Sequence, residues 1–70
     1  SATFKPGGRI YINLANAKDL AKLLDIPLAE AERLVAVRTD KGPFADMDAV
    51  RSVGGLTVAK IDARASELEF

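Results

Sequence analysis

Proline and glycine residues divide this chain into short segments, none long enough to form a domain alone. Pro27 lacks an N–H group and ends a helix that precedes it, and Gly42-Pro43 and Gly54-Gly55 break the chain twice more. Between these breaks, helix-forming residues carry apolar side chains at helical spacing. The sequence therefore predicts an all-α fold of short helices joined by tight turns.

Four helices are expected. The first covers residues 17–24 and follows Asn16, which is placed to cap it. The second covers residues 28–39. The third is a short helix capped by Asp46, and the last covers residues 56–66.

A short extended segment is expected before the helices. Ile10, Ile12 and Leu14 alternate with polar residues, as in a strand laid over an apolar surface. Residues 1–8 are rich in turn-forming Pro and Gly and are expected to be a flexible lead-in, so the predicted domain covers residues 9–70.

The chain is too short for a second domain. Its 70 residues can fill one small core, which is aliphatic because only four residues are aromatic. Leu68 and Phe70 form an apolar tail that we expect either to cover this core or to contact a neighbour.

The composition removes most enzyme classes. The absence of Cys and His excludes disulfides, thiolate or imidazole metal ligands, and nucleophilic catalysis that uses Cys or a Ser-His-Asp triad. Asp40, Asp46 and Asp48 are better explained as helix caps and helix-start acids than as a cation site. We expect no catalytic activity, no cofactor and no metal site.

The net charge is zero, with ten basic and ten acidic residues, so affinity for DNA would have to come from local geometry. Charges interrupt every apolar window of about 20 residues, and we expect no membrane insertion in this segment. The start at Ser1 without Met suggests part of a larger protein, and no targeting signal assigns it to a compartment.

The chain contains two copies of one unit. Residues 17–39 and 46–66 each comprise a short helix, a tight turn and a longer helix, and the turn Asp25-Ile26-Pro27 aligns with Ser52-Val53-Gly54. One such hairpin buries too little surface to fold alone. The sequence therefore predicts two hairpins packed about a pseudo-two-fold axis.

Several stretches together resemble a known family. They are Ile12-Asn13-Leu14-Ala15-Asn16-Ala17, residues 31–38, the turn Gly42-Pro43-Phe44, and Val53-Gly54 with Thr57, Lys60 and Ile61. From about Gly7 to Leu68 the chain resembles the paired helix-hairpin-helix domain of ComEA-like competence proteins. The resemblance implies binding to the DNA backbone without base readout, with turn amides and the start of each second helix facing a phosphate.

The two hairpins match this pattern unequally. Hairpin one has Asp25 and Pro27 at its glycine positions, so it repels a phosphate and lacks one amide. Hairpin two keeps Gly54, adds Gly55, and has no acid among residues 51–61. The resemblance places against the DNA backbone Arg51, Ser52, Gly54, Gly55, Thr57 and Lys60.

Two functions stay open. The first, which we favour, is a sequence-nonspecific module that binds double-stranded DNA mainly through hairpin two, with a Kd of about 10⁻⁴ to 10⁻⁶ M. The second is a degenerate helix-hairpin-helix domain that serves as a protein-protein interaction or structural module without DNA binding. Asp25 and Pro27 favour the second, and Gly54-Gly55 then simply permits a tight turn between helices.

Overall fold

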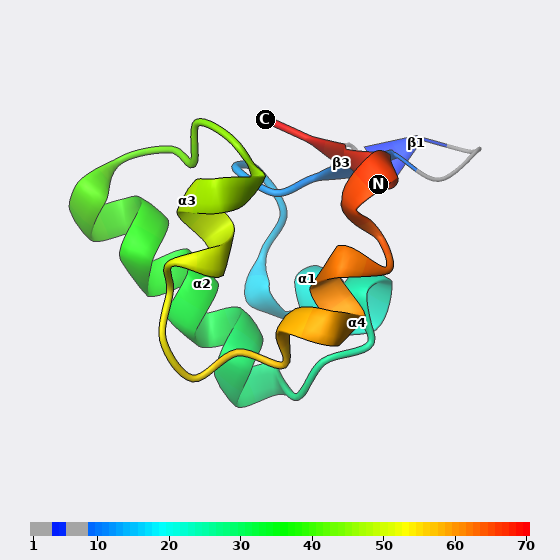
Figure 1. Cartoon of the computed structure of the whole chain (residues 1–70), viewed down its shortest axis with the longest axis horizontal. Helices are drawn as coiled ribbons and strands as arrows, with labels where there is room; N and C mark the ends of the chain where they lie inside the picture. Colours follow the sequence, from blue (N-terminus) through cyan, green and yellow to red (C-terminus); the bar gives the residue numbers. More distant parts are fainter. Residues whose placement is uncertain (1–3, 6–8) are drawn as a thin grey trace.

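The four expected helices are present in the computed structural model, which describes residues 4–5 and 9–70 (Figure 1). Short 3-10 helix η1 follows them, and three short strands complete the structure. The helices are α1 (Ala17–Leu24), α2 (Leu28–Lys41), α3 (Met47–Arg51) and α4 (Val58–Asp62), and η1 is Ala65–Glu67. The fold is two tandem helical hairpins, α1 with α2 and α3 with α4, preceded by an extended segment, as the sequence predicts.

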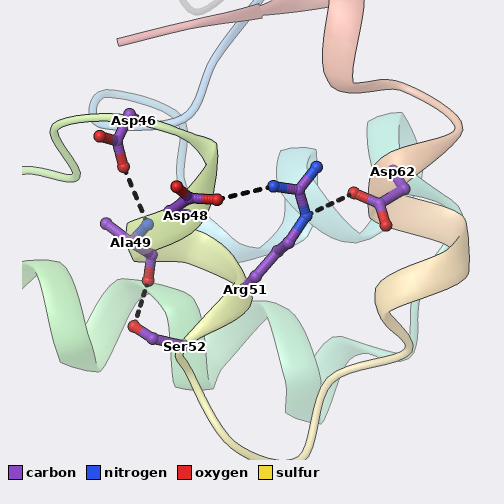
Figure 2. Close-up of polar contacts among 6 residues, drawn as sticks. All are labelled: Asp46, Asp48, Ala49, Arg51, Ser52 and Asp62. Atoms are coloured by element: carbon purple, nitrogen blue, oxygen red, sulfur yellow. Dashed lines mark hydrogen bonds and ion pairs between the residues drawn. The ribbon is translucent and has the colours of Figure 1, made fainter.

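Both predicted N-caps are confirmed. The Asn16 carboxamide accepts a hydrogen bond from the Asp19 amide at 2.8 Å, and the Asp46 carboxylate accepts one from the Ala49 amide at 3.0 Å (Figure 2). Each cap satisfies an amide that has no partner inside its helix. Polar side chains therefore fix the starts of α1 and α3.

The last helix is shorter than predicted. The sequence predicts a helix over residues 56–66, but α4 covers only Val58–Asp62. The Arg64 amide then donates to the Ile61 carbonyl, which is the tighter spacing of a 3-10 turn. This turn lets the chain leave the helix and brings Leu68 into the core.

The chain ends pair in a small sheet, which the sequence analysis did not predict. Strand β1 (Phe4–Lys5) pairs antiparallel with β2 (Arg9–Tyr11), and β2 pairs parallel with β3 (Leu68–Glu69). The predicted extended segment thus exists as β2. Of the lead-in predicted over residues 1–8, only β1 lies within the described residues.

The tail covers the core, one of the two roles expected for it. Leu68 is buried beside its strand partner Ile10, and an ion pair between Arg9 and Glu69 lies next to them. Phe70 stays about half exposed.

The core takes side chains from both hairpins and from β2. The side chains that are fully buried and largest are Ile10, Ile12, Leu20, Leu24, Leu34, Val50 and Ile61. Leu14 was expected on the same buried side as Ile10, but it is 67% exposed. The backbone turns after Tyr11, whose carbonyl accepts from the Leu14 and Ala15 amides, and Ala15 is buried instead.

A side-chain clamp joins the turn after β2 to the loop between the hairpins. Asn13 Nδ2 donates to the Phe44 carbonyl at 3.0 Å, and its Oδ1 accepts from the Phe44 amide at 2.7 Å. Nearby, Arg38 Nη1 donates to the Ile12 carbonyl at 2.8 Å, and partial burial lowers the pKa of this guanidinium. The clamp holds Phe44 in the core.

Within the described part of the chain, no helix combines the length and the apolar character needed to cross a membrane.

Candidate nucleic-acid interface

The turns of the two hairpins lie on one side of the molecule. In Figure 1 both run along the lower side, and the strands and the C-terminus lie along the upper side. Lys60 of hairpin two reaches the first turn at Asp25, and Arg33 of hairpin one reaches the second turn at Gly54. We call this side the turn surface and define it as residues 25–33 and 52–60.

The contacts on this surface follow the sequence repeat. Glu30 and Thr57, which are 27 residues apart, are hydrogen-bonded to each other. The same shift relates Arg33 to Lys60, and each of these two cations contacts the turn of the opposite hairpin. Such reciprocity is what a pseudo-two-fold axis produces, and it agrees with the predicted packing of two related hairpins.

Asp25 is the C-cap of α1, in the turn of hairpin one, and its backbone is left-handed, at φ 56° and ψ 48°. Glycine adopts this conformation without strain, which explains why the family pattern has glycine there. The Asp25 carboxylate lies 2.6 Å from Lys60 Nζ. The hydrogen bond and the charge of Lys60 lower the pKa of Asp25.

Thr57 is paired with a carboxylate of the other hairpin. Its amide donates to Glu30 Oε1 at 2.6 Å, and its hydroxyl donates to Glu30 Oε2 at 2.8 Å. The absence of acids near hairpin two, noted along the sequence, therefore does not hold in space. Hairpin one supplies Glu30 to Thr57 and Asp25 to Lys60.

Arg51 belongs to the contact between α3 and α4, and Ser52, at the edge of the turn surface, bonds back to α3. Figure 2 shows the Arg51 guanidinium extended from α3 toward α4, with Nη1 2.9 Å from Asp48 and Nε 3.0 Å from Asp62. The hydrogen bond and charge of Asp62 come first among the effects that raise the pKa of Arg51, and Asp48 adds to them. The Ser52 hydroxyl donates back to the Ala49 carbonyl at 2.7 Å.

The two glycines of hairpin two differ in what the fold requires of them. Gly55 has φ +81°, and a Cβ there would lie 3.0 Å from Arg33 Nε. Gly54 does not lie in the left-handed region, and a Cβ there would meet nothing within 4 Å. The fold explains a glycine at position 55, but it does not explain one at position 54.

Backbone amides are available at this turn. The N–H groups of Gly54 and Gly55 donate no hydrogen bond to any residue that the structure describes. Both residues are exposed. The turn therefore presents two adjacent donors that an anion can approach.

Of the six residues that the resemblance indicated, four lie on the turn surface beyond the end of α3: Gly54, Gly55, Thr57 and Lys60. Sequence reasoning missed Arg33, whose guanidinium lies against Gly54 and Gly55. The signal was present in the repeat, because Arg33 aligns with Lys60 and a pseudo-two-fold axis exchanges their positions. Among residues 4–5 and 9–70, no cluster of three or more acidic side chains is arranged to hold a metal ion.

Comparison with known proteins agrees with this architecture. The sequence profile of the helix-hairpin-helix motif matches residues 5–69, which include both hairpins and strands β2 and β3. Neither a search of curated proteins nor a search of solved structures finds a match. Motifs of this type are generally associated with nonspecific DNA binding. With both hairpins inside the matched range, the chain belongs to the helix-hairpin-helix motif family.

Proposed function

We propose that this protein binds double-stranded DNA weakly and without sequence specificity, through the phosphate backbone and mainly through hairpin two. The family supports the class of ligand, because helix-hairpin-helix motifs are generally associated with nonspecific DNA binding. The geometry of the second turn supports the location. The zero net charge of the chain supports a low affinity.

The observation that carries this proposal is the open surface at Gly54. Its backbone conformation is accessible to other residues, and a Cβ would meet no atom of the protein within 4 Å. A glycine that the fold does not need is explained if an external group must approach the backbone closely. A phosphate oxygen that accepts from the Gly54 and Gly55 amides is such a group.

The side chains around the turn support a low affinity for DNA. Lys60 and Thr57 belong to the same turn surface as Gly54, but each is already paired, with Asp25 and Glu30 respectively. A phosphate must compete with these carboxylates. Arg51 and Ser52 then act indirectly, by holding the start of the turn.

The test is a fluorescence-anisotropy titration of two labelled duplexes of unrelated sequence at about 50 mM and about 200 mM salt. We expect a Kd of about 10⁻⁴ to 10⁻⁶ M, the same for both sequences and weaker at the higher salt. Absence of binding at about 1 mM protein in low salt would contradict the proposal.

A second function is favoured by one observation: carboxylates of hairpin one form hydrogen bonds and an ion pair with the polar groups of hairpin two. The pairs Glu30–Thr57 and Asp25–Lys60 suit a degenerate domain that acts as a protein-protein interaction or structural module. Under this alternative the duplex does not bind, and Gly54→Glu has no effect on association with a protein partner.

Within the family, we propose a kinship with ComEA-like competence proteins. The support is the Asn13–Phe44 clamp, which joins two of the motifs that carry the resemblance. We propose no catalytic step for this domain. In a larger protein, further DNA-binding modules would raise the affinity through effective concentration.

A further inference from the structure

The geometry points to Arg33, a residue of hairpin one, as the cation that neutralises the phosphate bound at the Gly54-Gly55 turn of hairpin two. This inference rests on the proposed function and adds to it a binding residue from the opposite hairpin. The phosphate site is then shared between the hairpins, with the amides from one and the charge from the other.

The Arg33 guanidinium lies directly against the turn. Its Nε donates to the Gly54 carbonyl at 2.5 Å. A Cβ on Gly55 would lie 3.0 Å from Nε, 3.4 Å from Cζ and 3.5 Å from Nη2. The guanidinium therefore borders the backbone of both glycines, and the bond from Nε to the Gly54 carbonyl holds it there.

Most of the guanidinium donors remain available. The bond from Nε uses one of five N–H groups, and neither Nη1 nor Nη2 makes a hydrogen bond or an ion pair to the described residues. A planar fork of this kind matches two phosphate oxygens at once. Arg33 is also exposed, so a DNA backbone can reach it.

The other cations near the turn are already neutralised. Lys60 is paired with Asp25, and Arg51 is held between Asp48 and Asp62. In the described part of the chain, no carboxylate lies within ion-pair distance of Arg33. Arg33 thus offers a phosphate its full positive charge, without the cost of separating an existing pair.

The same contact explains Gly55. A side chain at this position would collide with the guanidinium, and φ +81° would strain it further. Because glycine has no side chain, the Arg33 guanidinium can lie directly against the backbone of the turn. One glycine accommodates the cation, and the other leaves room for the anion.

The test compares four proteins in duplex titrations at several salt concentrations: the unmodified chain, Arg33→Gln, Arg33→Lys and Lys41→Gln. Lys41 is the matched control, because it is exposed at the far end of α2 and its loss changes the net charge equally. We expect Arg33→Gln to weaken binding about tenfold and to reduce the slope of log K against log salt by about one. Arg33→Lys keeps the slope but binds more weakly, and Lys41→Gln stays close to the unmodified protein.

The outcomes separate the two proposals. No binding by the unmodified chain overturns the proposed function and the role of Arg33 together. Binding that Arg33→Gln leaves unchanged, or weakens with an unchanged salt slope, overturns only the role of Arg33, because a purely structural residue releases no counterion.

A second measurement uses only the unmodified protein, so it does not require any variant to fold. In a two-dimensional NMR titration of the unmodified protein with the duplex, the Arg33 Nε–H signal and the Gly54 and Gly55 amide signals are expected to shift together. Shifts of the glycine amides with an unmoved Arg33 signal would overturn the inference.

Discussion

Glu30 and Thr57 hold equivalent positions in the two hairpins and are hydrogen-bonded to each other, with the Thr57 amide 2.6 Å from one carboxylate oxygen of Glu30 and the Thr57 hydroxyl 2.8 Å from the other. The resemblance assigns Thr57 to a DNA phosphate, and here a carboxylate of the protein accepts from the same groups. Asp25 and Lys60 form a comparable pair. The protein therefore carries its own competitors for the anion.

Neutralising these competitors is expected to strengthen DNA binding. The double variant Asp25→Asn/Glu30→Gln removes two negative charges from the turn surface and releases Lys60, so we expect affinity to rise about tenfold and the salt slope to steepen by about one. The measurement is the duplex titration described above. Glu32→Gln/Asp40→Asn is the matched control for the two lost charges, because both residues are exposed on α2 and form no ion pair with the described residues. Equal gains in the double variant and the control would show that net charge alone is responsible.

The two glycines of hairpin two are expected to respond differently to alanine. Gly54→Ala meets open space and changes the free energy of unfolding by less than about 1 kcal/mol. Gly55→Ala puts a Cβ 3.0 Å from Arg33 Nε at a positive φ, and it costs at least about 1 kcal/mol. Chemical denaturation of both variants checks the contrast. Equal losses would mean that the fold requires both glycines, and the argument from Gly54 would fail.

The Asn13 clamp is expected to be a main source of stability. Asn13→Ala leaves both the amide and the carbonyl of the buried Phe44 without their partner, which costs about 1–3 kcal/mol. Denaturant unfolding measures the loss, and far-UV circular dichroism confirms that the variant still folds. A variant as stable as the unmodified protein would show that water replaces both bonds.

The Asp25–Lys60 pair is expected to make stability depend on pH. Lys60 lowers the pKa of Asp25 below its ordinary 3.8, so the contribution of the pair is complete above that value and is lost as the pH falls through the lower, folded-state pKa. The melting temperature of the unmodified protein, taken relative to Asp25→Asn, should therefore stay level down to about pH 5 and fall as the pH drops below about 4. Asparagine tolerates a left-handed backbone well, so Asp25→Asn can change the melting temperature for a reason unrelated to charge. The test is therefore how the difference in melting temperature changes with pH, and not its size at one pH. A constant difference would show that the pair does not stabilise the folded state.

Local sequence signals predicted most of the fold. The caps Asn16 and Asp46 and the breaks at Pro27 and Gly42 act within a few residues, so the helix starts and turns follow from the chain itself. The end of α4 did not follow from local signals. Residues 63–66 keep helical periodicity, but the burial of Leu68 against β2 decides where the helix ends, and that is a contact between the two ends of the chain.

The candidate site was only partly predictable for the same reason. The family pattern and the run Gly54-Gly55 indicated the turn, and in the structure both glycines and Lys60 are exposed, with Lys60 paired to Asp25. Counting charge along residues 51–61 missed Asp25 and Glu30, because these carboxylates arrive from the other hairpin. It missed Arg33 likewise, although the repeat aligns Arg33 with Lys60.

The most direct test of the central claim is duplex binding by Gly54→Glu at low salt. The open space at this position indicates that the variant folds, and it places a carboxylate where the account places a phosphate. Ser66→Glu adds the same charge at an exposed position next to β3 and serves as the control. We expect Gly54→Glu to abolish binding and Ser66→Glu to preserve it. Binding by Gly54→Glu at the affinity of the unmodified protein would show that the second hairpin turn is not where DNA is held.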